Sequence, residues 1–184
     1  MARDLISVKI SDRSVLAALE DIRRAGINPR SMLLEIGEDL AASTKQRFQT
    51  STAPDGSKWA KNSPVTIARY VHGRKGTKTK DNKMLSKFGS TRWDSKKPLI
   101  GLSKKLSHTI TYILRGHNEL QIGSPMIYAA THQFGASKGE FGTTKRGAPI
   151  PWGTIPARPF FGLSTADISL IITLTRLSLG PIAK

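Results

Sequence analysis

The spacing of apolar residues in the first third of the chain predicts one strand followed by two helices. Isoleucine and valine occupy every second position of residues 6–10, which is the period of a strand with one buried face. Ser11-Asp12 then offers N-cap oxygens to a helix that Gly26 ends. A second helix starts at Pro29 or directly after it, and its apolar residues recur at helical spacing up to about Phe48.

The second half of the chain predicts a β-hairpin flanked by helices. Its elements are a short helix at residues 102–106, strands at 109–115 and 120–122, and a helix at 127–134. A final helix begins near Ser164, because Asp167 follows three residues on in a capping-box arrangement. Strands and helices do not alternate as βαβ units, so we expect an α+β fold in which helices pack on an antiparallel sheet.

Two segments lack any such apolar pattern. Residues 60–97 are poor in apolar groups and rich in Lys, Gly, Ser and Thr, so we expect a long basic excursion that is partly ordered at best. Residues 135–153 form a second, Gly-rich loop. We expect the whole chain, residues 1–184, to form a single domain that carries these two loops.

Charge distinguishes the first of these segments from the rest of the chain. The net charge is +16, and residues 58–97 carry 12 basic and 2 acidic side chains. Such a patch is typical of contact with nucleic acid or with an acidic protein, although a solvated loop gives the same pattern. The candidate contacts with DNA or with an acidic partner are Arg69, Arg74, Lys75, Lys78, Lys80 and Lys83.

The sequence offers little that is typical of an enzyme or of a membrane protein. It has no Cys, no phosphate-binding Gly-x-x-x-x-Gly-Lys motif and no nucleophile elbow, and its four His residues lack the spacing of a zinc site. Its most apolar window, residues 168–179, is too short to span a bilayer. We therefore expect a non-enzymatic protein without cofactor, metal or membrane contact, made and kept in a cytoplasm.

Two side chains admit both a structural and a functional interpretation. His132 lies at the end of a predicted helix, where its imidazole could bind the last carbonyl oxygens or act in recognition; we favour the structural role, with Gly135 ending the helix. Trp59 borders the basic segment, where it could stack on unpaired bases or anchor a loop to its own domain or to a neighbouring subunit. The residues alone leave both choices open.

Several short motifs, in their order along residues 30–180, resemble the phage virion morphogenesis family. This family includes tail-completion proteins of P2-like phages and a morphogenesis protein of Mu-like phages. The motifs are Phe48, Pro54-Asp55-Gly56 with Trp59, Ile100-Gly101-Leu102, Tyr128-Ala129, His132-Gln133-Phe134-Gly135 and residues 155–164, Ile-Pro-Ala-Arg-Pro-Phe-Phe-Gly-Leu-Ser. The last of these is the most specific.

The resemblance implies a structural protein of a tailed phage, assembled in the host cytoplasm. Its expected place in the virion is the head–tail junction or the tail end, as a tail-completion, tail-terminator or neck (connector) subunit. Its expected partners are further copies in a ring, a hexamer in related proteins, and neighbouring neck, connector or tail-tube proteins, with non-specific contact to genomic DNA in the channel. We expect assembly contacts from Trp59, His132, Phe134, Arg158 and Phe160.

Arg158 lies between two prolines, so we expect its guanidinium group to be displayed for a partner. The same prolines also fix how the chain enters the final helix. Two rival functions stay open beside the head–tail role. One is a capsid-assembly factor from the same family. The other is a basic nucleic-acid-binding protein whose resemblance to the family is accidental.

Overall fold

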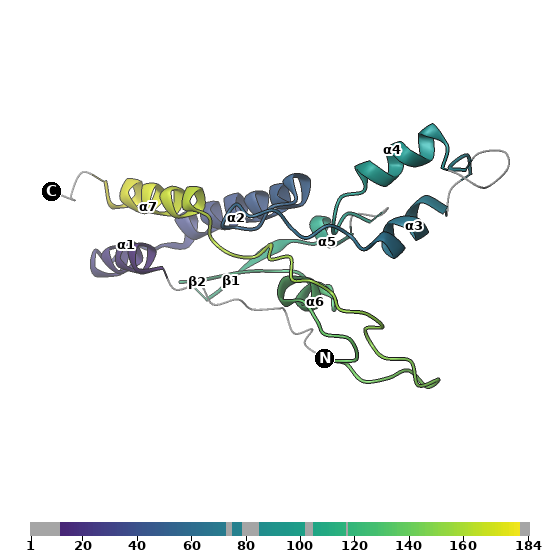
Figure 1. Cartoon of the computed structure of the whole chain (residues 1–184). Coiled ribbons are helices and arrows are strands. Elements are labelled where there is room, and N and C mark those ends of the chain that lie inside the picture. The colour runs from purple at the N-terminus through teal and green to yellow at the C-terminus, as the bar shows by residue number, and fades with distance from the viewer. Residues whose placement is uncertain (1–11, 73–74, 79–84, 102–104, 117, 181–184) are drawn as a thin grey trace.

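A computed structural model of the chain describes residues 12–72, 75–78, 85–101, 105–116 and 118–180. Figure 1 shows an elongated molecule in which a body of helices and a β-hairpin carries two arms at one end. The body contains α1 (Arg13–Arg24), α2 (Arg30–Thr50), β1 (Thr111–Arg115), β2 (Glu119–Gly123) and α7 (Thr165–Leu179). This arrangement confirms the predicted α+β class, with helices packed on an antiparallel pair of strands.

Helix α2 is the central element of the body. It begins directly after Pro29, as predicted, and ends at Ser51, whose φ of 55° closes the helix. Its N-terminal half packs against α1 and α7, and its C-terminal half reaches a second cluster with Phe48 at its centre. Phe48 has no exposed surface and packs edge-on against Trp59, with ring centroids 5.4 Å apart. One helix therefore joins the two clusters of buried residues.

The hairpin packs closely on α2 because Gly37 has no side chain. A Cβ atom at Gly37 would lie 2.5 Å from Cδ2 of Tyr112 and 2.9 Å from Cδ1 of Leu120. The two strands pair where the sequence predicted a hairpin, with Tyr112 opposite Ile122 and Leu114 opposite Leu120. These four side chains share the face that α2 covers, as the period of two requires.

Both predicted capped helices start where the sequence places them. The carboxylate of Asp12 accepts hydrogen bonds from the backbone N–H of Ser14 at 2.9 Å and of Val15 at 3.1 Å. At α7, the Ser164 hydroxyl accepts from the Asp167 N–H at 3.2 Å, and the Asp167 carboxylate accepts from the Ser164 N–H at 2.7 Å. The capping box of α7 is confirmed.

Two helices, which the sequence analysis did not assign, lie within the basic excursion of residues 60–97. These are α3 (Pro64–His72) and α4 (Lys87–Ser95). The signal was present in the sequence: Ser63 caps α3 by accepting from the Thr66 N–H at 3.3 Å, and Pro64 occupies the first helical position.

The remaining elements are α5 (Lys105–His108) and α6 (Ala129–Phe134), close to the predicted short helices. The strand predicted at residues 6–10 lies outside the described part of the chain. Within the described residues, no helix has the length and apolar character needed to cross a membrane.

Candidate functional site

The first arm, called the helical arm here, comprises residues 61–101 and is built from α3 and α4. Its two helices are held together by cations on an aromatic ring: the Arg92 guanidinium lies 4.5 Å and the Lys96 amine 4.9 Å from the centre of the Tyr70 ring. At Gly89, helix α4 also packs closely on the backbone of Thr77: a Cβ atom at Gly89 would lie 2.1 Å from the Thr77 carbonyl oxygen. The helical arm is thus a packed unit.

The second arm, called the loop arm, comprises residues 136–155 and has the predicted Gly-rich loop as its outer part. Backbone hydrogen bonds hold it in a ribbon, from the Phe141 N–H to the Ile150 carbonyl at 2.7 Å and from the Ile150 N–H to the Gly142 carbonyl at 2.8 Å. At its base, Ala136 and Ile155 exchange two further backbone hydrogen bonds of 2.9 and 2.8 Å. Because the ribbon is already ordered, its backbone loses less conformational entropy when its side chains bind a partner.

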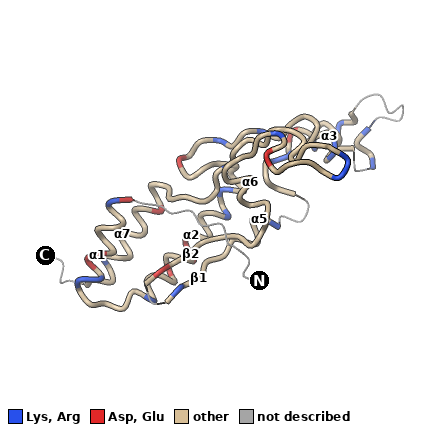
Figure 2. Tube along the Cα trace, turned by 90° about the horizontal axis from the view of Figure 1, so that it is seen from below, with Lys and Arg blue, Asp and Glu red and all other residues tan. Residues whose placement is uncertain are grey.

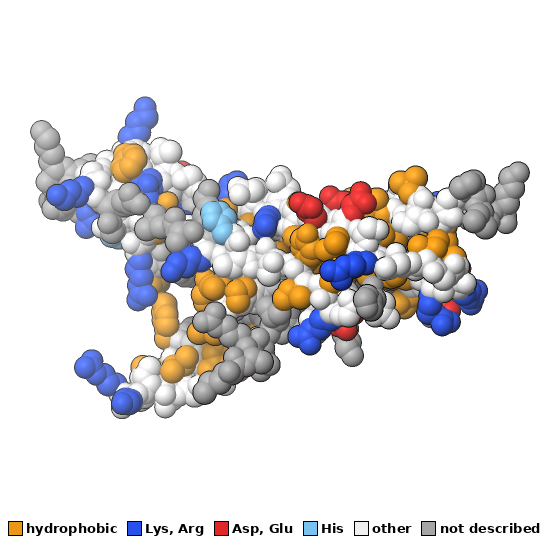
Figure 3. All heavy atoms as spheres, turned by 180° about the vertical axis from the view of Figure 1, so that it is seen from behind, with side chains coloured by type: hydrophobic (Ala, Val, Ile, Leu, Met, Phe, Trp, Pro, Cys, Tyr) orange, Lys and Arg blue, Asp and Glu red, His pale blue; other side chains and the backbone are white. Residues whose placement is uncertain are grey.

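Exposed large apolar side chains gather on the two arms and around α6. Eight of the twelve large apolar side chains that are exposed in the described chain lie on the two arms, on α6 or directly before it: Val65, Phe88, Ile127, Tyr128, Phe134, Phe141, Ile150 and Trp152. Figure 3 shows apolar side chains along the loop arm and cations at its tip, whereas carboxylates gather on the body. Exposed apolar surface of this kind is typical of protein interaction sites.

The base of both arms is fixed by the segment that precedes α7. The Arg158 guanidinium donates to the carbonyl oxygens of Ala60 at 2.9 Å and of Lys61 at 3.0 Å, and Trp59 donates from Nε1 to the Pro159 carbonyl at 2.8 Å. Arg158 is 5% exposed, so the expectation that its guanidinium is displayed is wrong. Its side chain points inward, where it ties the start of the helical arm to the body.

Trp59 and Phe160, two further predicted assembly contacts, also lie inside the subunit. Phe160 has no exposed surface and packs against Phe48 with ring centroids 5.2 Å apart. The anchoring interpretation of Trp59 is therefore confirmed for contacts within its own chain. Phe134 is different, because it remains 64% exposed at the end of α6.

A second buried arginine lies nearby, and it has a carboxylate partner. Arg47 of α2 donates to the carbonyl oxygens of Phe160 at 2.8 Å and Gly162 at 2.9 Å, and it forms a salt bridge with Asp167. Burial alone would raise the pKa of Asp167. Hydrogen bonds from Ser164 and Ser43 and the charge of Arg47 outweigh burial and hold that pKa below its usual value.

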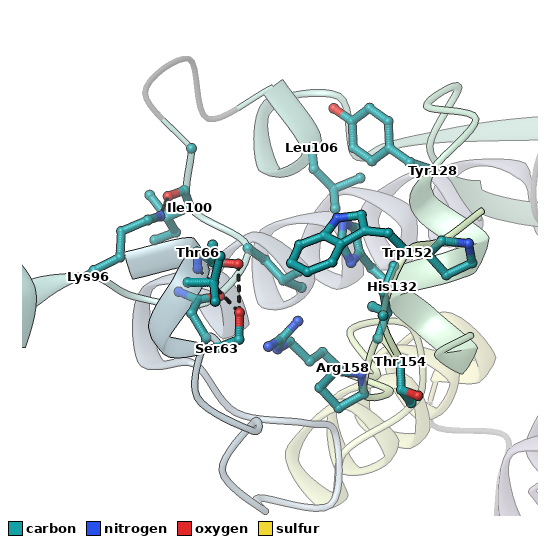
Figure 4. A pocket seen from close by; sticks show the side chains of 18 of the residues that line it. Ser63, Thr66, Lys96, Ile100, Leu106, Tyr128, His132, Trp152, Thr154 and Arg158 are labelled. Atoms are coloured by element: carbon teal, nitrogen blue, oxygen red, sulfur yellow. Dashed lines mark hydrogen bonds between the residues drawn. The ribbon is translucent and has the colours of Figure 1, made fainter. Parts of the chain in front are cut away.

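A cleft of about 590 Å³ lies between the two arms. In Figure 4, Ser63, Thr66, Lys96 and Ile100 lie on one side and Tyr128, His132, Trp152 and Thr154 on the other, with Arg158 between them. Trp152 also contacts the helical arm, since the Arg69 guanidinium lies 5.3 Å from the centre of its ring. The described residues that line this cleft include cations but no Asp or Glu.

His132 faces this cleft without the hydrogen bond that the sequence predicted. Its Nδ1 is buried and has no partner in the described part of the chain. The His132 carbonyl instead accepts from the Arg158 N–H at 2.8 Å, so the structural role assigned to the imidazole is wrong. Gly135 does follow the helix, with a φ of 82°. Burial and, secondarily, the positive charge of Arg158 lower the pKa of His132.

The predicted basic contacts are only partly covered by the structure. Arg69 and Lys75 are exposed on or beside α3, and Lys78 is exposed before α4. Arg74, Lys80 and Lys83 lie outside the described residues. Figure 2 shows Lys and Arg along the outer part of the helical arm. In the described parts of the chain, no three His, Asp or Glu side chains gather as a metal site would require.

Comparison with known protein families identifies the family of this chain. A family model described as the phage virion morphogenesis family matches residues 10–179, which include the body, both arms and the cleft. Neither the curated proteins nor the solved structures gave a match.

Proposed function

The chain belongs to the phage virion morphogenesis family, and on this premise we propose that it is a non-enzymatic structural subunit at the head–tail junction or the tail end of a tailed phage. The proposal covers a tail-completion, tail-terminator or neck (connector) role within the virion. The subunit acts by binding other proteins through its arms. Family membership supports a part in virion assembly, and the surface of the arms supports the mode of action.

The observation that carries the proposal is the exposed apolar surface of the two arms. Phe141 is 54% and Trp152 59% exposed, although the loop arm that carries them is held by backbone hydrogen bonds. Exposed aromatic side chains on an ordered ribbon are costly in water and are typical anchors of protein interfaces. The exposed apolar side chains of the arms therefore become buried against another protein chain.

Projecting arms suit assembly into a ring. In a ring each subunit uses one surface to contact a different surface of its neighbour, and an arm that leaves the body provides such a contact. Phe134, exposed beside the base of the loop arm, would extend the same surface. We propose a ring of copies, with six copies as in related tail-completion and terminator proteins.

The basic face of the helical arm has two candidate partners. Arg69, Lys75 and Lys78 are exposed cations that would bind an acidic surface on an adjoining ring, or phosphates of DNA in a channel. We place protein docking first, because DNA must slide through a portal and a tail without being held. Binding of the purified protein to duplex DNA, with a steep dependence on salt, would reverse this order.

Negative-stain electron microscopy of lysates from a phage with an early stop codon in this gene tests the proposal. Filled heads beside unattached or overlong tails are the expected result. Missing or aberrant heads would assign the protein to capsid assembly instead. Normal infectious particles would overturn the structural role altogether.

A further inference from the structure

The cleft between the arms contains a buried cation that lacks a counter-charge. Arg47 and Arg158 are each 5% exposed, and each guanidinium group donates to two backbone carbonyl oxygens. Arg47 also has the carboxylate of Asp167, whereas the ion pairs of the described chain include none with Arg158. A buried charge without a partner is costly, so an anion brought to Arg158 would be bound favourably.

A second unsatisfied group lies beside it. Nδ1 of His132 is buried without a hydrogen-bond partner, and the imidazole is close enough to Arg158 for that charge to lower its pKa. A carboxylate at this position would accept from both the guanidinium group and the imidazole N–H. Buried polar atoms in folded proteins nearly always have a partner, and the residue that carries this one lines the cleft.

The walls of the cleft define the rest of the occupant. They are largely apolar, with Leu106 and Ile155 at the base and Tyr128 and Trp152 at the mouth, and Lys105 adds an exposed cation. The volume of about 590 Å³ lies in the range of about 300–1,000 Å³ that is usual for binding pockets. A bulky apolar side chain next to a carboxylate fits this combination of walls and charges.

We propose that the cleft binds an extended, acidic segment of a different virion protein, with an aromatic side chain against Trp152 and a carboxylate directed at Arg158. This inference rests on the proposed assembly role. Another copy of the chain is disfavoured as the donor, because its extended loop arm is basic rather than acidic: it carries Lys138, Lys145 and Arg146 against Glu140. The carboxylates of α1 and α2 lie on packed helices and are not presented on an extended segment.

Fluorescence anisotropy of the full chain with a labelled, end-blocked peptide that alternates glutamate and phenylalanine tests the inference. Saturable binding is expected, and the same peptide with lysine in place of glutamate should bind at least about tenfold more weakly. Trp152→Ser and Lys105→Glu alter exposed positions in the cleft and should each weaken binding about fivefold or more.

The matched control variants are Phe88→Ser and Lys87→Glu, which change an exposed aromatic side chain and an exposed cation of α4 outside the cleft. Binding that these controls leave unchanged supports the cleft. Equal losses in the Lys87 and Lys105 variants would overturn it, because they would reveal general attraction between the net charges. Absence of saturable binding would also overturn it.

Two competitors test the identity of the occupant. Displacement of the acidic peptide by a peptide that copies residues 136–155 would assign the cleft to a second copy, and displacement by a single-stranded oligonucleotide would assign it to nucleic acid. Either result would overturn the inference. Failure of the broader assembly role shows separately, as normal particles from a phage that lacks the protein.

Discussion

Gln133 and Phe161 are joined by two hydrogen bonds that run in opposite directions. Nε2 of Gln133 donates to the Phe161 carbonyl oxygen at 3.0 Å, and Oε1 accepts from the Phe161 N–H at 3.0 Å. The same Oε1 accepts from the Phe160 N–H, also at 3.0 Å. A single buried amide thus satisfies three backbone groups and fixes α6, at the base of the loop arm, to the segment that enters α7.

Replacing Gln133 by Leu keeps a side chain of similar size but removes all three hydrogen bonds. Because the backbone groups would stay buried without partners, we expect the free energy of unfolding to fall by about 3 kcal/mol or more. Urea denaturation measures this loss. Gln121→Leu, on the hairpin, serves as the control and should cost less than about 1 kcal/mol; equal losses at the two positions would contradict the account.

The Arg47–Asp167 pair predicts a specific loss of stability in acid. Because the pKa of Asp167 is lowered in the folded chain, its contribution is fully present above its unfolded pKa of about 3.9 and is lost as the pH falls below that value. Asp167→Asn should lower the free energy of unfolding at neutral pH by about 3–5 kcal/mol. The variant should also lose less stability than the wild type on acidification; parallel pH profiles would contradict the assignment.

His132 predicts a second pH effect, at a higher pH. The pKa of the imidazole is lowered by burial and by Arg158, so below about pH 6.5 the unfolded chain binds a proton more readily than the folded chain. Stability should therefore fall as the pH drops from about 7.5 to about 5.5. His132→Gln should reduce this slope in denaturation profiles, whereas His108→Gln, which alters an exposed side chain, should leave it unchanged.

A substitution at Gly89 should disrupt the helical arm without damage to the body. Alanine is the better helix former by about 1 kcal/mol, but its Cβ would meet the Thr77 carbonyl oxygen at 2.1 Å. The backbone contact cannot yield cheaply, so Gly89→Ala should loosen the arm. Limited proteolysis should then cut residues 61–101 faster while the body remains resistant, and Ser90→Ala, one residue on, should show wild-type cleavage.

Much of the body could be predicted from local sequence signals. Asp12 and Ser164 cap helices through hydrogen bonds to residues that follow directly in the sequence, and the apolar spacing of α2 is likewise a local pattern. Such signals can be read directly from the sequence. The helices of the basic segment were missed because each is only nine residues long and their stability comes from contacts such as Arg92 on Tyr70. The Ser63-Pro64 start was the available signal.

The candidate site was harder to predict, because it depends on contacts between distant segments. Arg158 binds carbonyl oxygens 98 and 97 residues away, and nothing in its neighbourhood of prolines tells whether the guanidinium points outward or inward. Gln133 belongs to a recognised motif, but its role became visible only when Phe160 and Phe161 were placed against it. Sequence patterns locate such residues and leave their partners undetermined.

The most direct test of the arms as assembly surfaces is complementation of a phage that carries a stop codon in this gene. Phe141→Ser combined with Trp152→Ser removes exposed apolar surface from the loop arm, and Ile113→Ser combined with Leu177→Ser removes it from the body. With all proteins folded and expressed equally, we expect the arm variant to lower the plaque titre at least about a hundredfold. The body variant should complement like the wild type. A wild-type titre from the arm variant, or an equal loss from the body variant, would contradict the proposal that the arms carry the assembly contacts.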